Sequence, residues 1–277
     1  MSLCGQSASR TGRVRMTADS APAYPEIERI VAPNPGPMTL DGTNTYVVGT
    51  GDRSFVIDPG PADEEHLEAV RAATTRHGAP VGVLLTHSHS DHAAGAETLS
   101  FPLLWGQLGS GDESRWTAPP PAPSSVPDQI GPFRLLLTPG HATDHVCFAY
   151  ARVCFCGDLI LGEGFSIVPP AEFGGSLLDY MESLRSVAEL DLDLLCPGHG
   201  PWITDPTLKV AEYREHRLER ERRLVAALES GERSRARLLD RVWDDVPEQM
   251  RSAAAFAMQA HLEKLEAEGR LPRSLHD

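Results

Sequence analysis

Lysine, aromatic residues and long apolar runs are scarce in this 277-residue sequence. Lysine occurs only at Lys209 and Lys264, and the formal net charge is −14. Proteins that coat nucleic acids need basic side chains to neutralise phosphates, so this balance argues against that class. It does not exclude an anionic substrate at a locally positive site.

No apolar stretch approaches the ~20 residues that a membrane span needs, and the polar first 24 residues contain no apolar core of a secretory signal. The cysteines are odd in number, which argues against a disulfide framework, and a core of this size needs none. We therefore expect a cytoplasmic protein without membrane contact, whose thiols stay reduced. The cysteines are Cys4, Cys147, Cys154, Cys156 and Cys196.

The most informative stretch is residues 87–92, His-Ser-His-Ser-Asp-His. It follows an apolar segment typical of a buried strand and precedes small residues typical of a helix start. Three imidazoles and a carboxylate this close together are typical of metal ligands. In an extended chain alternate side chains share a face, so His87, His89 and Asp91 lie together. His92 then points elsewhere, and the pattern suits two adjacent metal ions.

Three later strand ends carry the same kinds of residue. His141, Asp158 and His199 each follow an apolar run and stand beside glycine or proline, which forces a turn. A histidine after a glycine is usually only part of a loop, but four such strand ends together indicate one site. We expect it at the edge of a sandwich of sheets, where rigid strands hold the ligands.

The order of these motifs resembles the metallo-β-lactamase-fold hydrolase superfamily: H-x-H-x-D-H, then Gly-His, Gly-Asp and Pro-Gly-His-Gly. Four further segments resemble its beta-lactamase-like protein 2 group: residues 34–46, 157–164, 213–217 and 261–265. That group has known endoribonuclease members and is similar to glyoxalase II thioester hydrolases. The resemblance covers nearly the whole chain.

The resemblance implies seven metal ligands in two sites. His87, His89 and His141 hold the first ion, Asp91, His92 and His199 hold the second, and Asp158 bridges both. Imidazole and carboxylate together suit zinc best, although iron and manganese also accept them. A metal lowers the pKa of bound water toward ~7, so we expect a metal-bridging hydroxide to attack a carbonyl carbon or a phosphorus. Asp91 and Asp158 are the candidate catalytic residues, and Asp91 can also take up a proton.

Five further residues are candidates for orienting ligands or contacting substrate. Asp58 ends an apolar strand and is expected to orient a ligand imidazole; the alternative is a turn-forming aspartate. His145 either supports the site or is an ordinary strand-end histidine. Phe165 and Ser166 stand where the resembled group usually has small or hydroxyl residues, so the pocket is expected to differ there. His216 falls in a matching segment and is expected to border the cleft.

The sequence predicts an α/β fold, and the resemblance implies a four-layer αββα sandwich with a small helical, winged-helix-like appendage. We expect a disordered N-terminal extension (1–24), a core with the metals at one edge (25–204) and a C-terminal appendage packing on it (205–277). Helices are expected at 63–77, 176–190, 205–228, 233–243 and 250–269. The arginines and glutamates interleaved in the first appendage helix are typical of a salt-bridged, solvated face.

The sequence is compatible with two hydrolytic functions. One is endoribonuclease-like cleavage of single-stranded RNA, favoured by the extent of the resemblance but opposed by the acidic balance and by few aromatic side chains for stacking bases. The alternative is glyoxalase II-like hydrolysis of a small acyl-thiol, which needs no basic groove. An idle binding module would have lost ligands, and none is lost. Flavin-linked diiron chemistry needs an electron-carrying partner domain that the sequence does not show, and nothing in it indicates an oligomer.

Overall fold

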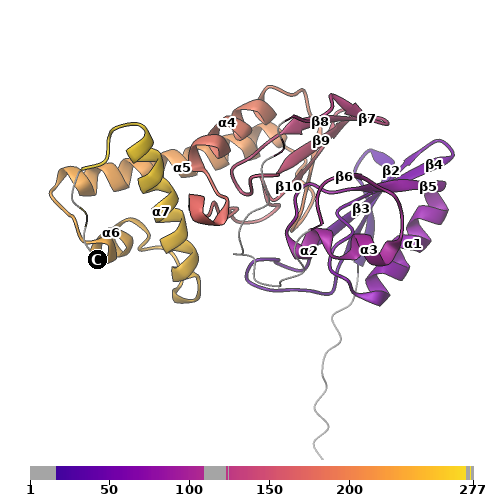
Figure 1. Cartoon of the computed structure of the whole chain (residues 1–277), viewed down its shortest axis with the longest axis horizontal. Coiled ribbons are helices and arrows are strands. Elements are labelled where there is room, and N and C mark those ends of the chain that lie inside the picture. The colour runs from indigo at the N-terminus through magenta and orange to yellow at the C-terminus, as the bar shows by residue number, and fades with distance from the viewer. Residues whose placement is uncertain (1–16, 109–122, 124, 273–274, 276–277) are drawn as a thin grey trace, which may run out of the picture.

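Two facing β-sheets with helices on their outer sides form the body of the protein, and further helices extend from it at the C-terminal end (Figure 1). This computed structural model describes residues 17–108, 123, 125–272 and 275. The expected αββα architecture with a helical appendage is confirmed.

The first sheet has six strands that lie side by side in chain order. They are β1 (Thr17–Ala21), β2 (Tyr24–Val31), β3 (Asn44–Thr50), β4 (Arg53–Ile57), β5 (Ala79–Leu84) and β6 (Leu103–Trp105). The strands are antiparallel as far as β4, whereas β4, β5 and β6 are parallel. The crossover from β4 to β5 is α1 (Glu64–His77), which buries Leu67, Val70 and Ala73 against the sheet, as its apolar spacing predicts.

The second sheet has the strand order β11-β10-β9-β8-β7. Its strands are β7 (Gln129–Ile130), β8 (Phe133–Leu137), β9 (Val146–Tyr150), β10 (Val153–Gly157) and β11 (Leu194–Pro197). Only the β10–β11 pair is parallel, because α4 (Leu177–Ala188) forms the crossover between them. The helix expected at 176–190 is therefore present, with Ser176 as its N-cap.

Aromatic rings fill the space between the two sheets. Phe55 of the first sheet packs against Phe133 of the second, with ring centroids 5.2 Å apart, and Tyr46 packs against Phe155 at 5.3 Å. All four side chains are buried. Because this core joins the sheets rigidly, loops from both can contribute to one site with fixed geometry.

Three helices form the C-terminal appendage: α5 (Pro206–Glu229), α6 (Arg235–Val242) and α7 (Arg251–Ala267), with a short 3₁₀ turn, η2 (Glu248–Met250), before the last. The helices expected at 205–228, 233–243 and 250–269 are thus confirmed to within a few residues. Their small apolar core is centred on Leu224, Leu238 and Trp243. Ala260 of α7 packs into the cluster formed by α4 and the second sheet, so the appendage is joined to the body.

The prediction of a disordered extension over residues 1–24 is wrong for its last part. Residues Thr17–Ala21 form β1 and pair with β2. Asp19 in this strand accepts hydrogen bonds from Arg29 and from the indole of Trp202. Trp202 lies far along the chain, and the small polar residues of the strand carry no apolar alternation, so local sequence did not reveal it. Residues 1–16 lie outside the described part.

Four of the five cysteines are buried free thiols, as expected, and Cys4 lies outside the described residues. Within the described ranges, no helix is both long enough and apolar enough to cross a membrane. The cytoplasmic location stays a prediction.

Candidate metal centre

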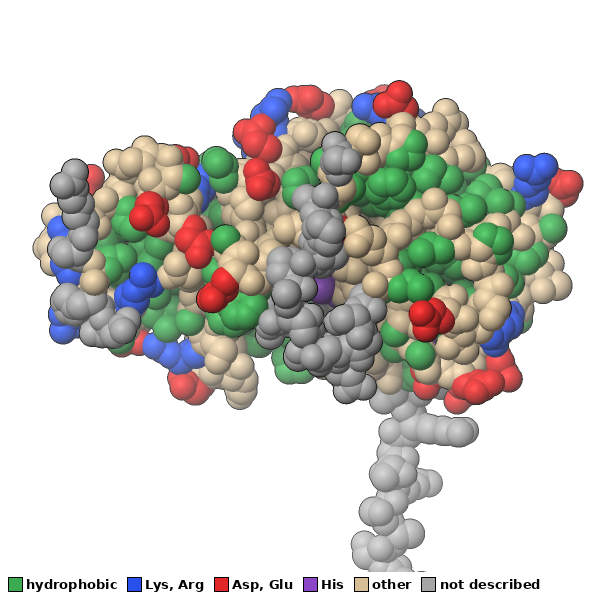
Figure 2. Space-filling view, viewed as in Figure 1, with side chains coloured by type: hydrophobic (Ala, Val, Ile, Leu, Met, Phe, Trp, Pro, Cys, Tyr) green, Lys and Arg blue, Asp and Glu red, His purple; other side chains and the backbone are tan. Residues whose placement is uncertain are grey.

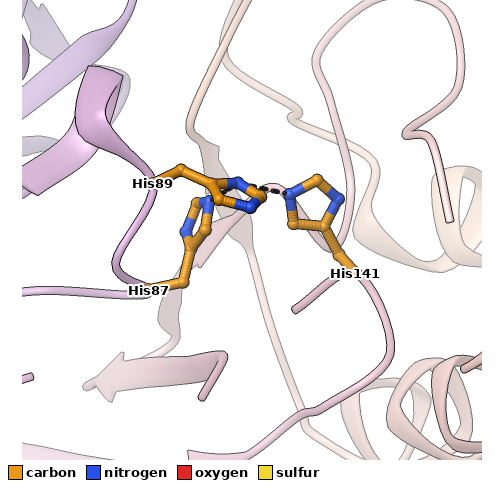
Figure 3. Close-up of side chains that lie close together, drawn as sticks. All are labelled: His87, His89 and His141. Atoms are coloured by element: carbon orange, nitrogen blue, oxygen red, sulfur yellow. Dashed lines mark hydrogen bonds between the residues drawn. The ribbon is translucent and has the colours of Figure 1, made fainter. Parts of the chain in front are cut away.

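The seven predicted ligands lie together at one edge of the two sheets, in three overlapping groups. The groups are His87–His89–His141, His87–His92–Asp158 and Asp91–His92–His199, and within each the ligand atoms lie within 4.8 Å of one another. Figure 3 shows the first group, with three imidazoles converging from two separate loops. Residues from four strand ends thus meet at one point, as the sequence predicts.

The backbone changes direction inside the His-Ser-His-Ser-Asp-His run. The chain is extended at His89, but a single helical turn, α2 (Ser90–Ala93), begins immediately after it, and α3 (Gly95–Leu99) follows. The expectation that Asp91 shares a face with His87 and His89 is therefore wrong. The helical turn instead places Asp91 beside His92, in the group with His199. This is the second metal site to which the family resemblance assigns Asp91.

Backbone carbonyls orient two of the imidazoles. His141 Nδ1 lies 2.8 Å from the carbonyl oxygen of Ile167, and His199 Nδ1 lies 3.2 Å from that of Gly42. A carbonyl oxygen only accepts hydrogen bonds, so Nδ1 carries the hydrogen in both rings. The other nitrogen, Nε2, faces the cluster and is the one left to bind a metal.

Asp58 orients two more imidazoles, as the sequence predicts for one. Its Oδ2 accepts a hydrogen bond from Thr86 Oγ1 at 2.7 Å and lies 2.9 Å from His92 Nδ1. Since the Thr86 hydroxyl gives its hydrogen to Asp58, it accepts one from His87 Nδ1, 3.0 Å away. Both rings then also turn Nε2 toward the cluster. Asp58 has a φ of 50°, an unusual and strained value for a non-glycine residue. The contacts of its carboxylate with Thr86 N, Thr86 Oγ1 and His92 Nδ1 offset the cost of this backbone conformation.

The inward nitrogens lie within hydrogen-bond distance of one another. His87 Nε2 is 2.9 Å and His141 Nε2 is 3.1 Å from His89 Nδ1 (Figure 3). His92 Nε2 is 3.3 Å from His199 Nε2. Lone pairs that face each other at such distances repel unless a proton or a metal ion lies between them. The donor set therefore fits two divalent cations.

Asp158 is placed to serve both ions. Its Oδ1 lies 3.4 Å from the Nε2 atoms of both His92 and His199, and its Oδ2 lies 3.6 Å from His141 Nε2. Oδ1 is buried and receives no hydrogen bond. One oxygen thus faces each ligand group, which is the geometry expected of a bridging carboxylate.

The two carboxylates set the protonation of the second group. Burial opposes charging His92, but Asp158 and Asp91 outweigh it and raise the pKa of His92 well above its usual value. The same balance, with Asp158 as the main opposing cause, raises the pKa of His199 to about 9. Burial likewise opposes ionising Asp158, yet His199 and His92 hold its pKa well below the usual range. Without metal the group therefore binds protons, which cations would displace.

Two glycines leave room for this cluster. A Cβ at Gly198 would lie 2.5 Å from Asp158 Oδ1 and 2.6 Å from His92 Cε1. A Cβ at Gly157 would lie 2.5 Å from Thr86 Oγ1, and the φ of Gly157 is 46°. The Gly-Asp and Pro-Gly-His motifs thus need glycine for space and backbone conformation.

His145 is not among the ligands. It belongs to none of the three groups, although its ring centroid lies 5.2 Å from that of His87. Its Nδ1 lies 2.9 Å from Thr138 Oγ1, and burial, followed by the neighbouring His141, lowers its pKa to about 3. Of the two interpretations left open by the sequence, support of the site or an ordinary strand-end histidine, the structure favours the first, because His145 packs behind the ligand His87.

A cavity of about 180 Å³ adjoins the cluster. His141 and Asp158 form its inner end, and the predicted Phe165 and Ser166 lie on its wall. The Ser166 hydroxyl donates a hydrogen bond to the backbone oxygen of Asp158 at 2.5 Å, so it supports the bridging residue. The remaining lining is mostly apolar: Pro37, Met38, Leu40, Leu161, Glu163, Gly164, Ile167 and Met250.

No lysine or arginine lines this cavity among the described residues, and Glu163 is its one charged side chain besides the ligands. In Figure 2 the Lys and Arg side chains lie mainly toward the edges of the drawn face. The apolar lining was not predicted. Met38 and Leu40 lie in a turn-rich segment without apolar periodicity, and Met250 arrives from the appendage.

Family comparisons agree with this geometry. A model described as the Metallo-beta-lactamase superfamily matches residues 38–103 and 124–199, and one described as a beta-lactamase associated winged helix domain matches residues 234–274. A solved metallo-beta-lactamase family protein from Thermus thermophilus has the same fold, with a TM-score of 0.68 over 90% of this chain and 95% of that one at 22% identity.

Two curated relatives differ in what their names state. The Beta-lactamase-like protein 2 homolog of Caenorhabditis elegans is 32% identical over 88% of this chain and 85% of its own length. The Atrochrysone carboxyl ACP thioesterase of Aspergillus chevalieri is 34% identical over 82% of this chain and 74% of its own length.

Proposed function

The chain belongs to the metallo-beta-lactamase superfamily, whose members are generally hydrolytic metalloenzymes, and from that premise we propose that it hydrolyses thioesters of small, apolar acyl groups. The observation that carries the proposal is the apolar cavity that opens directly onto His141 and Asp158. An acyl chain placed there would bring its carbonyl group to the ligand cluster at the inner end.

Seven residues would hold two divalent cations, which we propose to be zinc because of the mixed imidazole and carboxylate donors: His87, His89, Asp91, His92, His141, Asp158 and His199. When bound, the cations supply a water of lowered pKa and positive charge opposite the developing oxyanion.

The protein's own groups orient the reaction. His141 and Asp158 form the cavity's inner end, so they face the carbonyl group of the substrate. Asp91 is the more exposed of the two cluster carboxylates, at 11% of its side chain against 5% for Asp158. Asp91 is therefore the carboxylate best placed to exchange a proton between the site and solvent.

The apolar wall favours a thioester over the single-stranded RNA that the sequence placed first. A phosphodiester backbone needs cationic contacts along the chain, whereas the described cavity lining offers Glu163 and no cation. The name of the Aspergillus chevalieri relative supports the same choice. Endoribonuclease activity stays a prediction that the same experiment tests.

The test is a side-by-side assay of zinc-loaded protein on hexanoyl-N-acetylcysteamine and on single-stranded RNA. We expect thioester hydrolysis that falls on the order of 10³-fold in Asp158→Ala, because that variant loses the bridging ligand. Hydrolysis unchanged in Asp158→Ala, or cleavage of RNA alone, would reject the proposal. Leu208→Ala is a suitable control, because Leu208 is exposed and does not line the cavity.

A further inference from the structure

Helix α5 holds the outer wall of the cavity in place. The wall is the loop from Leu161 to Ile167, and the Tyr213 hydroxyl binds it at three points. The hydroxyl accepts hydrogen bonds from Leu161 N at 2.8 Å and Ser166 N at 3.3 Å, and it donates one to Gly164 O at 3.1 Å. The buried Arg217, one turn further along, donates a hydrogen bond to Ser166 O. The loop is thus anchored by its backbone to one face of a helix.

Phe165 at the centre of this loop stacks on the same helix. Its ring lies parallel to the His216 imidazole, with centroids 3.7 Å apart and an interplanar angle of 8°, and it also contacts Tyr213 at 5.0 Å. Burial, followed by the charges of Arg217 and Arg220, lowers the pKa of His216 to about 4. At neutral pH the imidazole is therefore an uncharged, flat support for the ring.

The cavity is small enough for this ring to matter. A closed cavity of ~150 Å³ accommodates a benzene molecule, so the ~180 Å³ found here can enclose roughly six to eight non-hydrogen atoms of a bound apolar group. Removal of the Phe165 ring would extend the space toward His216 and Tyr213. Met250 also lines the cavity, but a methionine side chain is flexible and can give way to a longer group.

We propose that the Phe165–His216 stack sets the longest acyl group that the cavity accepts, with an optimum of roughly six to eight carbons. Phe165 is then the specificity-determining residue, because its ring forms the wall. His216 is a positioning residue that acts through Phe165. The inference rests on the proposed thioester hydrolysis, and it gives the appendage a direct role in substrate choice, since α5 and Met250 come from that region.

The first test measures kcat/KM for hexanoyl, octanoyl and dodecanoyl thioesters of N-acetylcysteamine. One surplus methylene in a filled apolar pocket costs ~10-fold or more, so we expect the wild-type dodecanoyl-to-hexanoyl ratio to be at most about 0.1. Phe165→Ala should raise this ratio at least ~10-fold. His216→Ala should raise it by a smaller factor, and His216→Phe, which keeps a flat ring, should restore the wild-type ratio. An unchanged ratio in Phe165→Ala overturns the inference.

Leu218→Ala is the matched control. Leu218 lies on α5 with 38% of its surface exposed, close to the 39% of Phe165, but it does not line the cavity. Its ratio should equal that of the wild-type protein.

A second readout separates this inference from the proposed function. Binding of hexanoate, octanoate and dodecanoate to metal-loaded protein is measured by calorimetry, which needs no turnover. Tightest binding at roughly six to eight carbons, shifted to longer chains by Phe165→Ala, supports the inference even if no thioester is hydrolysed, in which case only the proposed function fails. Thioester hydrolysis together with binding that is independent of chain length overturns the inference and leaves the function standing.

Discussion

Two pairs of histidines in this protein, His92 with His199 and His216 with His261, have surroundings that shift their pKa values in opposite directions. In the metal centre, Asp158 and Asp91 outweigh burial and raise the pKa of His92 and His199. In the appendage, burial and neighbouring cations lower the pKa of His216 to about 4 and that of His261 well below its usual value.

The contrast separates two uses of one residue type. His92 and His199 face carboxylates that favour a positive charge at the rings, whether from protons or from metal ions. Histidines that face Arg217 and Arg220 stay neutral and act as flat packing surfaces, as His216 does under Phe165 and His261 does beside Trp243. A histidine count alone therefore does not define a metal site, because the surroundings of each ring decide what it does.

The largest effect is expected from removing the charge of Asp158 without changing the shape of its side chain, because this charge distinguishes the metal centre from the histidines of the appendage. Asp158→Asn should lose at least one of the two metal ions and lower kcat/KM on the order of 10³-fold. Elemental analysis and the thioester assay measure both. Full metal content with full activity would show that the bridging carboxylate is not needed.

A change in the core of the appendage should lower the stability of the protein without changing its metal content. Leu238→Ala removes a fully buried side chain from the appendage core and should lower the free energy of unfolding by about 2–5 kcal/mol. Urea unfolding measures this loss, while metal content should stay at the wild-type value. Loss of metal in this variant would mean that the two regions are not separable.

Removing the side chain that orients the metal ligands should have an intermediate effect on metal binding. Asp58→Ala removes the acceptor that orients His92 and, through Thr86, His87. We expect metal affinity to fall ~10–100-fold, measured by competition with a chelator of known affinity. Arg76→Ala, a change at an exposed ion pair, is the control and should leave affinity unchanged.

The smallest expected effect is on how the free energy of unfolding depends on pH, and it tests the uncharged environment assigned to His216. Its pKa is about 4 when folded and near 6.5 when unfolded. Between these values the unfolded state binds more protons, so His216 contributes stability above pH 6.5 that is lost as the pH falls toward 4. His216→Phe should therefore lose less stability than wild type between pH 7 and pH 5, as measured by urea unfolding at both values. An equal or larger loss contradicts the assigned environment.

Much of the site could be predicted because its residues carry local signals. The four strand ends bear ligand-type residues beside turn-forming glycine or proline, so His141, Asp158 and His199 could be joined to the His-Ser-His-Ser-Asp-His run from the order of residues alone. The helix turn at Ser90 was missed, because a four-residue helix has no periodicity to detect.

Other features depend on contacts between distant residues and leave no local pattern. Strand β1 is held in part by Trp202, and the cavity receives Met250 from the appendage. The support of Phe165 by His216 likewise joins residues from two separate elements, a loop and a helix, and each side chain alone is unremarkable in the sequence.

Titration of metal-free protein with zinc at pH 7.5 tests the central claim most directly, with bound ions and released protons counted together. The binuclear account predicts two ions per chain. It also predicts proton release, because the pKa of His199 is about 9 before metal binds and the displaced proton must leave. His199→Ala should bind fewer ions and release fewer protons. One ion per chain, with His199→Ala indistinguishable from wild type, would contradict the account.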